Sequence, residues 1–103
     1  SDKLRKKLKE NSLYFREKMT ALGFQLVSGE HPIIPVMLGD AKLAQAVAEQ
    51  MLKHGVYVIG FSYPVVPEGK ARIRTQMSAA HTEEDLDLAI GSFRQVGKDL
   101  KII

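Results

Sequence analysis

Residues 71–78 alternate between small or apolar side chains and polar ones without a break. A period of two places successive side chains on opposite faces of a strand, so this segment is predicted to be a strand with one buried face and one open face. Such a strand is typical of an antiparallel sheet that is covered on a single side. The buried set is Ala71, Ile73, Thr75 and Met77, and the open set is Arg72, Arg74, Gln76 and Ser78.

Apolar residues at helical spacing predict a first helix that begins near Asp2, a possible N-cap, and ends at Gly23. Residues 24–27 and 33–38 are then predicted to be strands. Because proline cannot donate to a sheet ladder, we expect the second strand to lie at an edge of the sheet or to have a bulge near Pro35. The apolar stripe of the first helix consists of Leu4, Leu8, Phe15, Met19 and Leu22.

Two further helices and another strand are predicted in the rest of the chain. Asp40 is a good N-cap for a second helix, which ends at Gly55. Residues 56–61 are apolar on both faces, so they predict a strand that needs cover on both sides. Thr82 opens a third helix with three acidic residues in its first turn, where the helix dipole favours negative charge. The order of elements predicts a two-layer α+β sandwich, with helices on one face of a mostly antiparallel sheet.

The composition limits the class of protein. A length of 103 residues suits one domain, so we expect residues 1–103 to form a single domain. The chain has no cysteine, which excludes a disulfide framework and a thiolate metal site. Much of the net charge of +3 lies in the basic run 3–9, which we interpret as a solvated helix face. It has neither the interleaved aromatic residues of a nucleic-acid platform nor enough apolar residues for a membrane surface, so we expect neither partner.

The open face of the predicted strand 71–78 carries two arginines. Side chains two positions apart on a strand point the same way, so Arg72 and Arg74 would stand about 6.6 Å apart along it. The paired N–H groups of a guanidinium match two oxygens of a carboxylate or phosphate at once. Two interpretations remain open from these residues alone: ordinary surface arginines on an open face, or a site that binds an anion.

The loop Ser62–Lys70 leads directly into this strand. Its prolines and glycine forbid regular structure, yet it contains Tyr63, Val65 and Val66. Apolar residues in such a loop usually pack against something. The loop therefore either caps the core of this domain or forms a lid or an interdomain contact.

The sequence lacks the parts of a complete active site. The three histidines His31, His54 and His81 are dispersed without metal-ligand spacing, and we interpret His81 as a turn residue or cap partner. No nucleophile motif and no glycine-rich phosphate loop is present. The lysines all lie in polar contexts, whereas a Schiff-base lysine needs an apolar one to lower its pKa. We therefore predict no catalytic residue and no metal ligand within these residues.

Two stretches resemble a known family. Residues 31–40 resemble the start of the small domain in glycine C-acetyltransferases, and residues 60–82 resemble the signature of that domain. The likeness spans nearly the whole chain. Related α-oxoamine synthases share the Arg-x-Arg strand and a following histidine, and the residues Phe61 to Pro67, Phe-Ser-Tyr-Pro-Val-Val-Pro, point to the aminoketobutyrate branch.

This resemblance implies the C-terminal small domain of a fold-type I pyridoxal phosphate enzyme, a homodimer in the bacterial cytoplasm or the mitochondrial matrix. The intact enzyme condenses glycine with acetyl-CoA to give 2-amino-3-ketobutyrate, or runs the reverse cleavage in threonine breakdown. The resemblance assigns Arg74 to the substrate carboxylate, leaves Arg72 structural or secondary, and makes the loop with Ser62 and Tyr63 a mobile cover. The residues that bind pyridoxal phosphate belong to the large domain of the same chain, so the isolated piece is expected to be inactive.

Two hypotheses from other classes compete with this one. The chain could be a stand-alone α+β module that binds a small anion or a partner protein through the arginine face. It could also be a basic nucleic-acid binder that uses Lys3 to Lys9 together with the arginines, and salt-dependent binding to DNA or RNA would favour that hypothesis.

Overall fold

The computed structural model describes the whole chain, Ser1–Ile103, as three helices and a four-stranded sheet. None of the helices is long and apolar enough to span a bilayer. The order of helices and strands is the one predicted from the sequence. The helices are α1 (Asp2–Leu22), α2 (Ala41–Lys53) and α3 (Glu83–Asp99), and the strands are β1 (Gln25–Leu26), β2 (Ile33–Gly39), β3 (Ile59–Phe61) and β4 (Ala71–Gln76).

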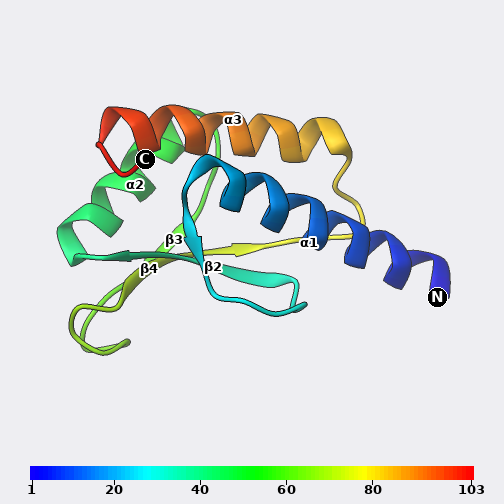
Figure 1. Cartoon of the computed structure of the whole chain (residues 1–103), viewed down its shortest axis with the longest axis horizontal. Helices are drawn as coiled ribbons and strands as arrows, with labels where there is room; N and C mark the ends of the chain where they lie inside the picture. Colours follow the sequence, from blue (N-terminus) through cyan, green and yellow to red (C-terminus); the bar gives the residue numbers. More distant parts are fainter.

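The strands lie in the order β1-β2-β4-β3, and every neighbouring pair is antiparallel. Figure 1 shows all three helices on one side of this sheet, while the other face has no covering layer. Along β4, Ala71, Ile73 and Thr75 are buried and Arg74 and Gln76 are exposed, as the alternating pattern predicts. The predicted two-layer α+β sandwich is therefore confirmed.

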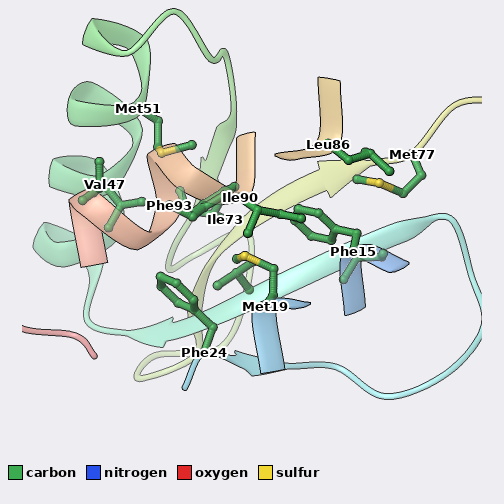
Figure 2. Close-up of a cluster of buried hydrophobic side chains, with 13 residues drawn as sticks. Phe15, Met19, Phe24, Val47, Met51, Ile73, Met77, Leu86, Ile90 and Phe93 are labelled. Atoms are coloured by element: carbon green, nitrogen blue, oxygen red, sulfur yellow. The ribbon is translucent and has the colours of Figure 1, made fainter. Parts of the chain in front are cut away.

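The core lies between the sheet and the helices. Figure 2 shows side chains of α1, α2 and α3 converging over β4, with Ile73 beneath them. Phe93 of α3 stands at its centre and makes edge-to-face contacts with Phe15 and Phe24, at centroid distances of 6.2 and 5.9 Å. Such pairs add to the stabilisation from burial alone. This packing fixes β4, and with it the arginines on its opposite face.

The helix starts follow the sequence closely, with one correction. Asp40 and Thr82 cap α2 and α3 as predicted. The N-cap of α1, however, is Ser1 rather than Asp2, because the Ser1 hydroxyl accepts a hydrogen bond from the backbone N–H of Leu4. Leu4 itself is 59% exposed, so it does not belong to the buried stripe. The reason is visible in Figure 1, where the first turns of α1 extend beyond the end of the sheet.

Of the two alternatives predicted for residues 33–38, an edge position or a bulge near Pro35, the edge position is wrong, because β2 lies between β1 and β4. The backbone N–H of Val27 donates to the carbonyl of Pro35 at 3.2 Å. Since the N–H and C=O of one strand residue point to the same side, the missing donor of Pro35 faces β1. Because that side faces away from β4, the absent N–H costs no hydrogen bond between β2 and β4. β1 itself ends at Leu26. A register shift does occur nearby, between Met37 and Gly39.

The strand expected over residues 56–61, which needs cover on both faces, is shorter than predicted. Only Ile59–Phe61 form β3, which is the edge strand beside β4. Tyr57 is 77% exposed and Ile59 is 41% exposed. Apolar residues on both faces of this segment indicate a need for cover on both sides. Within this chain, however, the helices cover one face of the sheet and leave the other face open.

Candidate functional site on the open face of the sheet

The open face brings both predicted arginines together with residues of the neighbouring strands. The register places Arg74 between Pro35 of β2 and Ile59 of β3. One pair of residues further along, Arg72 lies between Met37 and Phe61 in the same way. Paired residues of an antiparallel sheet share a face, so the guanidiniums stand on the face opposite the helices. The two arginines therefore share one face of the sheet, as the sequence predicts.

Arg72 is half-buried and already has a hydrogen-bond partner. Its Nε donates to the backbone carbonyl of Lys70 at 3.0 Å. This bond ties the side chain to the end of the loop Ser62–Lys70, just before β4 begins. Arg72 therefore has a structural contact of its own, which leaves fewer of its donors for a ligand.

Arg74 is exposed, and its guanidinium makes no hydrogen bond or ion pair with the protein. The structure contains one side-chain ion pair, between Arg5 and Asp2 at the start of α1. The contact that Arg74 does make is with an aromatic ring: its guanidinium carbon lies 5.0 Å from the centroid of Phe61. The five N–H donors of this side chain are therefore available to an anion. No carboxylate of this chain competes for them.

A groove of about 570 Å³ borders Arg74. It lies where β3 stops short of the end of β4, so the last residues of β4 have no strand beside them on that side and α3 forms the opposite wall. Most of the lining is apolar, and its polar residues include the exposed carboxylate of Asp85 as well as Arg74 and Gln76. The residues that matter here are Tyr57, Ile59, Arg74, Gln76, Leu88 and Phe93. The arrangement suits an apolar group with a negative charge at one end.

The loop Ser62–Lys70 does not cap the core of the chain. The backbone N–H groups of Val65 and Val66 donate to the carbonyl of Ser62, which makes the loop a tight turn. Tyr63 and Val65 nevertheless point to solvent, with exposed fractions of 66% and 74%. Of the two interpretations left open by the sequence, packing on this domain's own core is therefore not what the structure shows.

Two contacts near the site concern His81 and a residue that the sequence analysis missed. His81 is a turn partner, as predicted, because its Nδ1 accepts a hydrogen bond from the backbone N–H of Ser78 at 3.1 Å. Asn11 was not predicted. Its side-chain amide donates to the carbonyls of Ser78 and His81, both at 2.9 Å, and so joins α1 to the turn after β4. The signal was a polar residue at a buried helical position between Leu8 and Phe15.

The comparison with protein families decides the relationship. The model of the family "Aminotransferase class I and II" matches residues 1–93. The chain belongs to this family. Among curated relatives of this aminotransferase-family chain, it is 56% identical over 100 residues to 2-amino-3-ketobutyrate coenzyme A ligase of Salmonella typhimurium, covering 97% of the chain and 25% of the relative. It is 61% identical over 84 residues to the mitochondrial human protein of the same name, covering 82% of the chain and 20% of the relative.

Solved structures of other proteins share the fold of this aminotransferase-family chain. A serine palmitoyltransferase of S. paucimobilis, solved with a bound PLP–myriocin aldimine, superposes with a TM-score of 0.93 at 27% identity, covering 99% of this chain and 26% of that one. The 8-amino-7-oxononanoate synthase of Francisella tularensis superposes with a TM-score of 0.79 at 25% identity, covering 99% and 28% of the two chains. This chain thus spans about a quarter of the length of the curated relatives and solved structures that it matches.

The lysines and the carboxylates of this chain all lie at its surface. All ten lysines are exposed, whereas a Schiff-base lysine stands in a desolvated, apolar site. Every aspartate and glutamate is exposed as well, so no buried carboxylate is present to pair with a pyridine nitrogen. The exposed guanidinium of Arg74 carries N–H donors of the kind that suit an anion.

Proposed function

We propose that this chain is the C-terminal small domain of a glycine C-acetyltransferase, also named 2-amino-3-ketobutyrate coenzyme A ligase. The intact enzyme condenses glycine with acetyl-CoA to give 2-amino-3-ketobutyrate, or cleaves that product in threonine breakdown. Identities of 56% and 61% to bacterial and mitochondrial proteins of that name support the assignment. The resemblance of residues 60–82 to the small-domain signature supports the C-terminal position. We place the enzyme in the bacterial cytoplasm or the mitochondrial matrix.

The observation that carries the proposal is the state of Arg74. Its guanidinium is exposed on the open sheet face, borders the groove and has no carboxylate partner in the chain. A free guanidinium can hold both oxygens of a carboxylate with two parallel, charge-assisted hydrogen bonds. We therefore assign Arg74 to the carboxylate of glycine and of 2-amino-3-ketobutyrate, and Arg72, which is held by the Lys70 carbonyl, to a secondary role.

The loop Ser62–Lys70 is proposed to cover the site in the intact enzyme. The exposed Tyr63 and Val65 leave apolar surface in water that a second wall would bury. Ser62 stands where the loop leaves β3, and its carbonyl closes the turn that displays those side chains. Closure of such a loop would exclude water from the bound carboxylate and strengthen its contact with Arg74.

The cofactor is proposed to be pyridoxal phosphate, held by a large domain of the same polypeptide in a homodimer. That group supplies the electron sink for the reaction, while this domain orients the substrate carboxylate. The exposed lysines of this chain support a cofactor site elsewhere. We accordingly expect no transferase activity from the 103 residues alone. A stoichiometric adduct of pyridoxal phosphate at one lysine of this chain, trapped by borohydride, would contradict that expectation.

The test of the carboxylate role is Arg74→Ala in the full-length enzyme that contains this chain. We expect the KM for glycine to rise about 10- to 100-fold, because a charged hydrogen-bonded contact of about 1.5–3 kcal/mol is lost. The KM for acetyl-CoA should change little, since that substrate does not present the amino-acid carboxylate. Arg94→Ala, at an exposed arginine of α3, is the matched control. An unchanged glycine KM in the Arg74 variant would refute the role.

A further inference from the structure

The guanidinium of Arg74 is held by a ring and not by a hydrogen bond. Its central carbon lies 5.0 Å from the ring centroid of Phe61, the last residue of β3. Cations are attracted to the face of an aromatic ring at this distance. In the sheet register Phe61 is opposite Arg72, so Arg74 meets it along the diagonal between neighbouring strands. Diagonal neighbours are within reach of aromatic and long side chains.

We propose that Phe61 is a positioning residue, which holds the Arg74 guanidinium in place for a substrate carboxylate. This inference rests on the proposed role of Arg74. A ring contact restrains the guanidinium through attraction to its positive charge, and the ring presents no oxygen that would accept from its N–H donors. An acidic neighbour would also restrain it, but would occupy the donors that the substrate needs. Contact with a ring is thus a way to order an anion-binding arginine and leave it free to bind.

The two partners differ in how firmly the fold holds them. Phe61 is half-buried, and its strand is fixed by pairing with β4 and by the packing of Gly60 against α2 at Ala44. Arg74 is exposed, and a long arginine side chain loses rotamer entropy when it is fixed on binding. Restraint by the ring removes part of that loss before the substrate arrives, which favours binding.

Arg72 provides the contrast on the same sheet face. Its Nε is tied to the Lys70 carbonyl, so a backbone acceptor sets its position and takes up one donor. Both arginines come from β4, yet the fold restrains one by a hydrogen bond and the other by a ring. The ring contact is the feature that distinguishes the arginine with all its donors free.

The first measurement uses the 103-residue chain and does not depend on enzymatic activity. The Nε–Hε resonance of Arg74 should be shifted upfield by the ring current of Phe61. In Phe61→Leu this shift should be lost, whereas Phe61→Tyr, which keeps the ring, should retain it. The resonance of Arg16, which is held by the carbonyls of Val27 and His31, reports whether the fold is intact. An unchanged Arg74 resonance in Phe61→Leu would overturn the contact.

The second measurement is made in the full-length enzyme. Phe61→Leu should raise the KM for glycine about threefold with little change in kcat, which is the size expected for an exposed cation–ring contact. Phe61→Tyr should restore the wild-type KM, and neither change should alter the KM for acetyl-CoA. In an Arg74→Ala background, Phe61→Leu should have no further effect, because the pair acts as a unit.

The outcomes separate this inference from the proposed function. If Arg74→Ala leaves the glycine KM unchanged, the carboxylate role itself fails. If Arg74→Ala raises the KM but Phe61→Leu does not, the carboxylate role stands and the positioning role is refuted. An equal effect of Phe61→Leu with and without Arg74 would also refute it, because Phe61 would then act by another route.

Discussion

Two glycines of α3 offer a test of how tightly the helical layer is packed. Gly97 is buried, and a Cβ placed on it would lie 2.6 Å from Cζ of Phe24 and 3.0 Å from Cγ1 of Ile103. Gly91 lies in the same helix, is exposed, and would have no atom within 4 Å of its Cβ. Alanine is the smallest change that adds this atom, so the pair compares one methyl group in two environments.

The expected sizes follow from these distances. Either substitution gains about 0.8–1.0 kcal/mol from the helix propensity of alanine over glycine. At position 97, carbon atoms that prefer separations of about 3.5–4.0 Å would be forced closer, so the Phe24 ring must move by about 1 Å. That ring is buried and packs against Phe93, so the strain should cost about 1–3 kcal/mol. We expect Gly91→Ala to stabilise by about 1 kcal/mol and Gly97→Ala to destabilise by about 1 kcal/mol.

Urea denaturation followed by circular dichroism measures both variants, with the slope m expected to stay unchanged. A difference of about 2 kcal/mol between them corresponds to roughly 10 °C in Tm for a chain of this size. Phe24→Leu combined with Gly97→Ala should recover part of the loss through coupling of neighbouring residues. If Gly97→Ala proves as stable as Gly91→Ala, the packing of Phe24 and Ile103 against α3 is not as tight as described.

Three further predictions concern the N-cap of α3, a carboxylate in its first turn and a contact between two helices. Thr82→Ala should destabilise the fold by about 1 kcal/mol in urea denaturation, because the N-cap of α3 is lost, and Thr82→Ser should restore most of it. Hydrogen bonds from the backbone and side chain of Thr82 lower the pKa of Asp85 from 3.8, so the stability that they give is present above pH 3.8 and is lost as the pH falls through the lower folded pKa. Urea midpoints across that acid range should show the loss in wild type and a smaller one in Asp85→Asn. The hydrogen bond from the Tyr14 hydroxyl to Asp87 raises the pKa of Tyr14 from 10.0 to about 12. Tyrosinate absorbance should show this late titration, and Asp87→Asn should bring the pKa of Tyr14 back toward 10.0. An unchanged titration in the variant would contradict the contact.

The local features of the fold could be predicted from the sequence because each depends on residues close in the chain. An N-cap side chain accepts a hydrogen bond from a backbone N–H three residues further along the chain. The caps at Asp40 and Thr82 were both predicted correctly. The alternation of residues 71–78 fixed which side chains of β4 face the helices. It also placed Arg72 and Arg74 on one face, which is where the structure has them.

The features that were predicted wrongly depend on partners far away in the chain. Pro35 predicted an edge strand or a nearby bulge. The sheet order gives β2 two neighbours, which excludes the edge, and the irregularity lies between Met37 and Gly39. The apolar residues before β3 predicted a covered strand, yet their cover is not among these residues. Which strands pair, and in which order, is set by contacts across the whole core, so local periodicity does not contain it.

The amino-acid sequence by itself determined the period of each element, its caps and the face on which each arginine stands, because these follow from the spacing of neighbouring side chains. Only the tertiary structure decided which of the two guanidiniums keeps its donors free. Arg72 donates to the carbonyl of Lys70, two residues away, whereas Arg74 meets Phe61 because β3 lies beside β4. A contact between residues on two strands requires the sheet to form, since only pairing brings them within reach.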